Sequence, residues 1–386
     1  MALPQFDRAA GMVEDALKKP AGATRVKSNR ASINLALQGG GSHGAFTWGV
    51  LDRLLTQDGL TFGWISATSA GAINAVALAA GLAAGGREGA RAKLQQVWDA
   101  VAKASSPEYL KMNPLLAGIS RSSAMAQMAQ MFSPYDLNPL GIDPLRRLIE
   151  AHIDFEMIRT TKGPELLIAA THVASGTPRF FRRAELTIEA VLASACLPML
   201  QHAVEIDGQA YWDGGFSANP ELLTLAAESP IEDTLIVQLV PLLRTQKPTS
   251  AREIGGHISH LTFNAPFVRE LEQIETIRRL ASRRRGLFGG PIEGRDARVA
   301  AHRFHLVEAG RFTGSLTVES RGKPELELLT YLQNSGAAEA GKWLDRSWRD
   351  VGVRDTAEIA QRLAAHRASA LPVTATASNR KPDAAA

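Results

Sequence analysis

Short apolar runs alternate with longer amphipathic stretches in the first part of the chain. Residues 33–37 form an apolar run that stops at a glycine cluster, which is typical of a buried strand. Residues 45–55 then repeat apolar side chains at helical spacing, and residues 62–65 form a second apolar run before a long Ala-rich stretch. Because strand and helix alternate with short joints, the pattern predicts parallel strands connected by right-handed crossovers.

Capping and turn residues mark further elements. Asp143 followed by Pro144 predicts the start of a helix, because Asp caps a helix and Pro fits its first position. Asp207-Gly208 between two short apolar runs is a strong signal for a β-hairpin. Strands are further expected at residues 166–171, 179–182, 235–240 and 304–307, and helices at 187–195, at 249–285 and, as a pair, at 326–344.

The predicted fold is an α/β domain of three layers, with a mostly parallel central sheet flanked by helices. The chain has 386 residues, of which 45% are hydrophobic, so it can bury a large core. A net charge of +4 gives no sign of nucleic-acid binding. The single cysteine, Cys196, rules out an internal disulfide and a multi-cysteine zinc site. Because no secretory signal or bilayer-spanning apolar stretch is seen, a cytoplasmic protein is expected.

A glycine-rich loop follows the first predicted strand and opens a helix; it reads Gly39-Gly40-Gly41-Ser42-His43-Gly44. Glycines let consecutive backbone amides turn toward one point, and the helix N-terminus adds partial positive charge, so the loop can cradle an anion. The loop contains G-x-G-x-x-G, but a dinucleotide site needs an acidic residue at the end of the next strand and a P-loop needs a lysine. Neither residue is present, and a plain glycine turn is the remaining alternative.

The second predicted strand leads into Ala67-Thr68-Ser69-Ala70-Gly71, just before a helix. This is the pattern of a nucleophile elbow, in which the serine sits on a strained turn and its neighbours must be small. Ala67 replaces the first glycine of that pattern and is the smallest departure from it. The alternative is a serine that caps the N-terminus of the helix.

Both loops are expected at the same edge of the sheet, because adjacent parallel strands bring their carboxyl ends together. The amides of the glycine loop then point to the space above Ser69 Oγ, which is the arrangement of an oxyanion hole beside a nucleophile. Asp213, at the end of the predicted hairpin, is followed by Gly214 and Gly215 and can approach a second backbone closely. A simple Asp-Gly turn is the alternative for this motif.

Together these three motifs resemble those of the patatin-like phospholipase family. The segment 194–198, with small residues before a proline, is also similar to that family, and order and spacing agree over about residues 33–220. The resemblance implies a lipid acyl hydrolase of the phospholipase A, lysophospholipase or esterase type, which cleaves carboxylic esters and uses no metal or other cofactor.

The resemblance also implies roles for individual residues. Ser69 attacks the ester to form an acyl-enzyme, Asp213 takes its proton without help from a histidine, and the loop amides hold the oxyanion. The implied oxyanion residues are Gly39, Gly40, Gly41 and Ser42, and the supporting small residues are Gly44, Ala67, Gly71, Gly214 and Gly215. His43 stands where the family usually has Arg or Lys, which can change the charge beside the hole.

The chain is expected to divide into four parts. Residues 1–32 form a polar N-terminal segment, and residues 33–310 form the patatin-like catalytic domain with a helical insertion at 85–130. Residues 311–364 are expected as C-terminal helices packed on that domain, and residues 365–386 as a disordered tail.

Two other functions remain open at this level. Four histidines follow Asp213 and allow the Ser…Asp…His order of an α/β-hydrolase triad; they are His257, His260, His302 and His305. A catalytically silent protein that keeps the fold as a lipid-binding module or scaffold is the second alternative, favoured by the departures at Ala67 and His43. Cys196 is expected as a small core residue rather than a nucleophile.

One basic cluster is expected at the surface. Its members are Arg278, Arg279, Arg283, Arg284 and Arg285, followed by Leu287 and Phe288. Basic and apolar side chains together suit peripheral contact with anionic lipids, and a solvated loop is the alternative. The expected partner is therefore a lipid acyl ester, with no nucleic acid, and the oligomeric state is left open.

Overall fold

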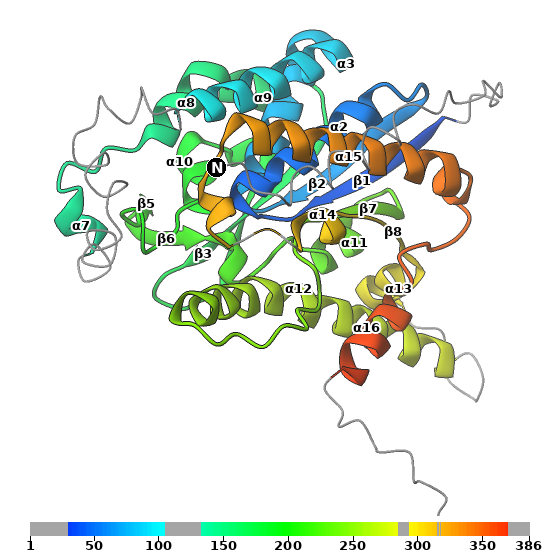
Figure 1. The fold of residues 1–386 in the computed structure, drawn as a ribbon. Coiled ribbons are helices and arrows are strands. Elements are labelled where there is room, and N and C mark those ends of the chain that lie inside the picture. Colours follow the sequence, from blue (N-terminus) through cyan, green and yellow to red (C-terminus); the bar gives the residue numbers. More distant parts are fainter. Residues whose placement is uncertain (1–29, 105–132, 285–292, 315, 317, 370–386) are drawn as a thin grey trace, which may run out of the picture.

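The computed structural model describes residues 30–104, 133–284, 293–314, 316 and 318–369. Within these residues, eight strands form one central sheet (Figure 1). The strands are β1 (Ala31–Leu37), β2 (Leu60–Ala67), β3 (Glu165–His172), β4 (Pro178–Arg182), β5 (Val204–Ile206), β6 (Gln209–Asp213), β7 (Asp233–Gln238) and β8 (Arg303–Glu308). Their spatial order is β5-β6-β3-β2-β1-β7-β8, with β4 also paired to β3. From β3 to β8 all neighbours are parallel, whereas β4, β5 and β6 pair antiparallel.

Helices cover both faces of the sheet, which gives the three layers that the sequence predicts (Figure 1). One face carries α2 (Gly44–Leu55), α3 (Ala70–Ala104), α8 (Pro144–His152), α9 (Phe155–Thr160), α10 (Ile188–Ser194) and α15 (Leu326–Ser347). The other face carries α11 (Leu223–Glu228), α12 (Ala251–Arg284), α13 (Gly294–Ala301) and α16 (Ile359–Ala368). Shorter elements are α7 (Pro134–Leu137), α14 (Gly310–Thr313), η1 (Gly41–His43), η2 (Arg183–Glu185), η3 (Gly214–Phe216), η4 (Val318–Gly322) and η5 (Trp348–Asp350).

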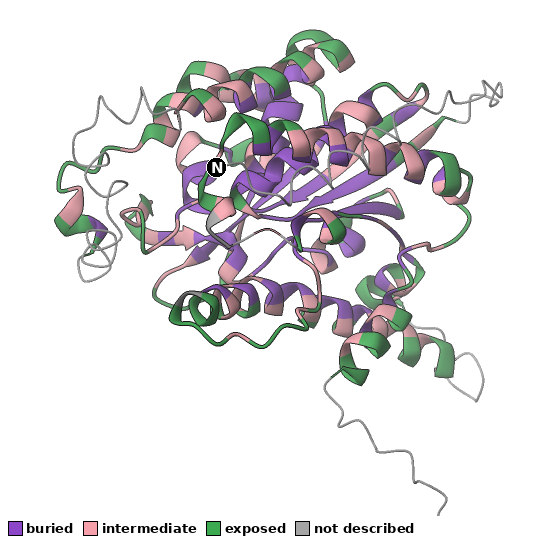
Figure 2. Ribbon diagram, in the orientation of Figure 1, coloured by how far each residue is buried: buried purple, intermediate pink, exposed green. Residues whose placement is uncertain are grey.

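The sheet separates two hydrophobic cores. Successive strand residues point to opposite faces, so Leu35 and Leu37 of β1 join the core that contains Leu51 of α2. Ala36, between them, joins the second core with Phe267 of α12. Figure 2 shows the central strands mostly buried, while the outer faces of the helices are exposed. The central strands are therefore covered on both sides, which explains why they appear in the sequence as continuous apolar runs.

Capping and turn predictions are confirmed. The Asp143 side chain accepts a hydrogen bond from Leu145 N at 2.9 Å at the start of α8. Asp207 and Gly208 connect β5 to β6 with φ values of 52° and 73°. A two-residue hairpin of the type I′ class requires a positive φ at both positions, and these residue types tolerate it.

The closing helices differ from the prediction in two places. The helix pair expected at 326–344 is the single helix α15. It stays continuous because Gly336 serves close packing rather than a break: a Cβ there would collide with the Phe46 carbonyl of α2. Residues 365–368, predicted as part of a disordered tail, belong to α16, which Leu363 anchors in the second core.

The long helix α3 has non-helical backbone angles at residues 85–86, where it kinks. After the kink the helix packs back on its first half, and Trp98 Nε1 donates to Asn74 Oδ1 at 3.0 Å. The beginning of the helical insertion expected at 85–130 therefore lies against the sheet-covering helices. Residues 105–130 of that prediction lie outside the described part of the chain.

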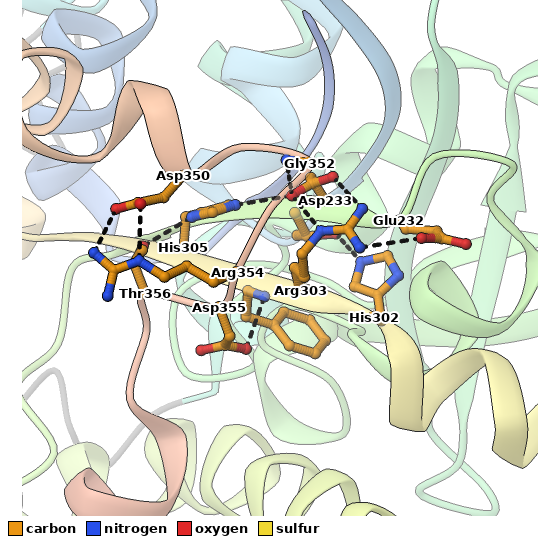
Figure 3. A network of polar contacts seen from close by, with 12 residues as sticks. Glu232, Asp233, His302, Arg303, His305, Asp350, Gly352, Arg354, Asp355 and Thr356 are labelled. Atoms are coloured by element: carbon orange, nitrogen blue, oxygen red, sulfur yellow. Dashed lines mark hydrogen bonds and ion pairs between the residues drawn. The ribbon is translucent and has the colours of Figure 1, made fainter.

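A polar network ties the C-terminal segment to the amino end of the sheet (Figure 3). Asp233, the first residue of β7, accepts from Arg303 Nη2 at 2.8 Å, from Gly352 N at 2.9 Å and pairs with His305 Nε2 at 3.1 Å. Burial raises the pKa of Asp233, but its hydrogen bonds with His305 and Arg303 outweigh burial and hold it below the usual range. His305 is therefore hydrogen-bonded within this network at the amino end of β7, and not at the carboxyl ends of the strands.

Candidate active site

Ser69 forms the turn between β2 and α3 and has a φ of 55°. A positive φ is uncommon for a residue with a side chain and costs free energy, so it points to a function for this position. A serine that only caps a helix normally has extended backbone angles, which Ser69 does not have. The backbone of Ser69 is therefore that of a nucleophile elbow.

Ala67 is the last residue of β2 and is fully buried. It is not among the described residues with positive φ, so the strand geometry itself does not require glycine here. Its strand neighbours are Leu37 of β1 and Ile168 of β3. We therefore expect this position to restrict side-chain size rather than backbone angle.

The glycine loop and the elbow lie side by side, as the sequence predicts. Leu37 and Ala67 are paired across parallel strands β1 and β2, and the loop begins directly after Leu37. A Cβ added at Gly39 would lie 2.8 Å from Ser69 Cβ, closer than such carbons approach. Glycine at position 39 is what lets the loop come this near to the serine.

The amides of the glycine loop have different surroundings. The Gly39 amide donates to Asn219 Oδ1 at 2.8 Å, so it is already occupied and anchors the loop instead of serving as an oxyanion donor. Gly41 has a φ of 58°, and a Cβ there would collide with the Arg321 carbonyl. The loop turns sharply at Gly41, and the Ser42 hydroxyl donates to that same carbonyl at 3.0 Å.

Asp213 ends β6 and lies beside β3, where it is paired with Ala170. Its amide donates to Cys196 O at 2.7 Å, and its Oδ1 accepts from Gly215 N at 2.8 Å. The side chain is completely buried. Gly214 and Gly215 follow in η3, and a Cβ on Gly214 would collide with the Ala169 carbonyl.

The second carboxylate oxygen of Asp213 has no hydrogen-bond partner among the described residues. Burial raises the pKa of Asp213 to about 7, and the Gly215 amide and the Ser69 hydroxyl oppose that rise. The Ser69 hydroxyl is thus close enough to favour the charged carboxylate, although it does not reach normal hydrogen-bond geometry with Oδ2. Such contacts are often loose before substrate binds. A buried carboxylate with a raised pKa and a free oxygen beside a serine can accept a proton near neutral pH.

The end of α10 and the residues that follow it contact both Ser69 and Asp213. Ser194 Oγ accepts from the Ser69 amide at 2.9 Å, and the Cys196 carbonyl accepts from the Asp213 amide. Cys196 itself is buried, its Sγ lies 3.0 Å from His202 O, and burial raises the pKa of its thiol to about 12. Cys196 is therefore a core residue, as expected, and not a reactive thiol.

None of the four candidate histidines makes a hydrogen bond to Ser69 or Asp213 in the described structure. His302 Nε2 lies 2.7 Å from Thr234 Oγ1. His305 belongs to the network around Asp233 at the amino end of β7, whereas Ser69 follows the carboxyl end of β2. His257 and His260 lie on α12, and burial lowers the pKa of His260 to about 4. The geometry does not assemble a Ser-His-Asp triad from them.

Arg278 is not available for the lipid contact expected of the basic cluster. Its Nη2 forms an ion pair with Asp355 at 2.7 Å, and its guanidinium lies 5.5 Å from the centre of the Phe304 ring. The other members are Arg279 and Arg283, which are exposed, and Arg284 and Arg285, whose side chains lie outside the described residues.

Two positioning residues were not predicted from the sequence. Asn219 accepts from Gly39 N and donates through Nδ2 to Phe263 O of α12 at 2.9 Å, so it fixes the loop to this helix. Ser194 holds the elbow amide. The Asn-Pro pair at residues 219–220 is a turn signal that marks the segment, but it does not reveal what the side chain binds.

Comparison with known proteins gives one family. The model described as patatin-like phospholipase matches residues 35–226, and no curated protein matches the chain significantly. VipD from Legionella pneumophila is 14% identical over 92% of this chain and 80% of its own, with a TM-score of 0.37. The ExoU–SpcU complex from Pseudomonas aeruginosa is 15% identical over 89% of this chain and 59% of the other, with a TM-score of 0.29. The type III effector ExoU is 16% identical over 89% and 87%, with a TM-score of 0.23.

Proposed function

Because residues 35–226 of the chain belong to the patatin-like phospholipase family, we propose that the protein is a serine lipid acyl hydrolase that uses a Ser69–Asp213 dyad. The observation that carries the proposal is the strained backbone of Ser69 beside a buried carboxylate whose Oδ2 has no partner among the described residues. The family supports a lipid ester as substrate. The local geometry supports the proposed dyad and oxyanion donors.

The proposed reaction has two halves. Ser69 Oγ attacks the carbonyl carbon of the ester, and its proton moves to Asp213 Oδ2. The negative oxygen of the tetrahedral intermediate is held by the amides of Gly40, Gly41 and Ser42, helped by the N-terminus of α3. The intermediate collapses, the alcohol leaves with the proton from Asp213, and the acyl group stays on Ser69. A water molecule then gives a proton to Asp213 and attacks the acyl-enzyme. The second tetrahedral intermediate collapses, the fatty acid leaves, and Ser69 Oγ takes the proton back from Asp213.

The C-terminal region belongs to the same functional unit in this proposal. α15 packs along α2, the helix that the glycine loop opens, and η4 lies against the loop itself. Arg321 of η4 accepts the Ser42 hydrogen bond through its carbonyl. We therefore expect residues 311–364 to be needed for an ordered oxyanion loop.

Lipid substrates are reached at a surface. In the described part of the chain, no helix combines the length and the apolar composition needed to cross a bilayer. On α12, Ile254, Ile258 and Leu261 are exposed apolar residues on one side of the helix, and the same helix carries exposed Arg279 and Arg283. Apolar and basic side chains on one helix suit peripheral contact with an anionic membrane surface, which we include in the proposal.

A fluorophosphonate probe tests the proposal, because it reacts covalently with an activated serine. We expect labelling of the wild type together with hydrolysis of a p-nitrophenyl acyl ester. Ser69→Ala abolishes both, and Ser282→Ala, a change at an exposed serine of α12, abolishes neither. A folded wild type that is neither labelled nor active would contradict the proposal and favour a silent lipid-binding protein.

A further inference from the structure

Four nitrogen-bearing side chains gather beside the glycine loop and take no part in the proposed dyad. His43 ends η1 and Arg321 lies in η4, whereas Arg244 lies between β7 and α12 and His260 lies on α12. Each has a buried nitrogen without a hydrogen-bond partner in the described structure: Nδ1 of both histidines and Nε of both arginines. Buried polar atoms are rarely left unpaired in folded proteins, so such a group points to a missing ligand.

Arg321 is held directly against the loop. Its carbonyl accepts from Ser42 Oγ at 3.0 Å, and a Cβ added at Gly41 would lie 3.4 Å from Arg321 Cβ. The neighbouring residue Ser320 places its Oγ 2.7 Å from His43 Nε2. The backbone around Arg321 is thus fixed by the same loop that approaches Ser69.

Arg244 follows β7, and its charge acts on Arg321 and on both histidines. The chain leaves β7 next to the loop, where Leu239 would touch a Cβ on Gly40 at 3.0 Å. Asn264, one turn after His260, then holds this segment to α12 through Nδ2 contacts of 3.5 Å to the carbonyls of residues 241 and 242. The charges of Arg244 and Arg321 lower the pKa of both His43 and His260, so all four side chains share one electrostatic environment.

The cluster carries uncompensated positive charge. Burial, aided by the two arginines, lowers the pKa of His43 to about 3 and of His260 to about 4, so both are neutral at pH 7. Burial and the charge of Arg244 lower the pKa of Arg321 to about 10, which leaves it charged. No described carboxylate pairs with either arginine. Two like charges in a half-buried place are costly unless an anion joins them.

We propose that Arg244 and Arg321 form a phosphoryl-binding subsite beside the glycine loop, with His43 and His260 as neutral polar groups in its wall. A guanidinium presents a planar set of donors that matches phosphate oxygens, and both arginines keep part of their surface accessible. The ligand is a phosphoryl group, from a lipid headgroup or from free phosphate. For the lipid source the subsite rests on the proposed function, because the loop places it next to the ester that Ser69 would attack.

A pair of substrates that differ only in the phosphate tests the lipid source. We compare phosphatidic acid with diacylglycerol of the same acyl chains, presented in the same detergent micelles, and measure kcat/KM for each. Arg244→Gln lowers the phosphatidic acid to diacylglycerol ratio by about tenfold or more, since it removes a charged donor to the phosphate. Arg244→Lys, which keeps the charge but loses the planar fork, recovers part of the ratio. Arg269→Gln, at an exposed arginine of α12, keeps the wild-type ratio.

Calorimetric titration of the folded proteins with glycerol 3-phosphate and with inorganic phosphate tests the subsite without catalysis. Binding to the wild type that weakens in Arg244→Gln supports it, even if no lipid is hydrolysed and the proposed function fails. Weakened binding with an unchanged substrate ratio assigns the subsite to free phosphate. An unchanged ratio in folded Arg244→Gln, together with equal or absent phosphate binding in both proteins, overturns it.

Discussion

The hydroxyl of Ser194 accepts a hydrogen bond from the backbone amide of Ser69 at 2.9 Å. Ser194 is fully buried at the end of α10, so this contact lies inside the protein rather than in solvent. It gives the strained turn at Ser69 one fixed partner outside its own helix. We expect the contact to stabilise the positive φ of Ser69 and so to set the direction of Oγ.

Ser194→Ala should lower kcat by about tenfold while KM stays close to wild type, because a buried amide that loses its acceptor costs roughly 1–3 kcal/mol. Steady-state kinetics on a soluble ester give this split. Ser335→Ala is the matched control, since Ser335 is equally buried and hydrogen-bonded but belongs to α15. Equal kcat in both variants would show that Ser194 is only a packing residue.

Ala67 tests whether the elbow restricts size or backbone angle. The residue is fully buried between two strands and has no positive φ. Ala67→Val should abolish most activity, since overpacking a buried site costs about 1–3 kcal/mol and here displaces the turn that carries Ser69. Ala67→Gly should keep activity, with a stability loss of about 0.5–1 kcal/mol from added chain freedom. The rate of fluorophosphonate labelling measures the activity of both variants. A Val variant that reacts at the wild-type rate would contradict the conclusion that this position restricts side-chain size.

The strands and loops that carry the site were predictable because their signals are local. Apolar runs that end at glycines located β1 and β2, and the rule that parallel strands share their carboxyl edge placed Gly39 beside Ser69. The hairpin signal at residues 207–208 likewise placed Asp213 at the end of a strand. Each motif was found from residues that are neighbours in the sequence, and a general rule of parallel sheets then brought two of the motifs together.

Contacts between distant segments were not predictable in the same way. The Gly39 amide was assigned to the oxyanion hole, but Asn219, 180 residues away in the sequence, takes that donor. His43 stood out as uncharged, yet nothing local indicates that Arg244 and Arg321 bring charge to its side. The prediction of a helix pair at 326–344 was wrong for a related reason. Only the packing of α15 on α2 shows that Gly336 permits close contact between the two helices.

The pH dependence of hydrolysis should follow Asp213. Burial raises its pKa to about 7, and only the ionised carboxylate can take the proton of Ser69. We therefore expect kcat/KM to be low at acidic pH and to rise as pH passes through about 7. His257→Ala and His260→Ala should leave the midpoint in place, since neither histidine contacts the dyad. A profile that is flat through this range, or a midpoint that moves in one histidine variant, would contradict Asp213 as the base.

The same buried carboxylate should cost the protein stability. The folded-state pKa of about 7 lies above the ordinary value of 3.8, so the unfolded chain ionises Asp213 more readily than the folded one. The cost is absent below pH 3.8, grows as pH rises and is complete above about 7, where linkage sets it at up to about 4 kcal/mol. Asp213→Asn removes the charge but keeps an acceptor for the Gly215 amide, and its new buried amide donors take back roughly 1–3 kcal/mol.

We therefore expect Asp213→Asn to be catalytically dead yet more stable than wild type by about 1–3 kcal/mol above neutral pH, with the gain shrinking as pH approaches 4. Urea unfolding above neutral pH and near pH 4 measures the difference in the free energy of unfolding between Asp213→Asn and wild type. Ser69→Ala is the matched control, because it is equally inactive but leaves the buried charge in place, so it should not reproduce the pH-dependent gain. If Asp213→Asn is less stable than wild type at both pH values, Asp213 does not carry a charge in the folded protein near neutral pH, and it cannot be the base that activates Ser69.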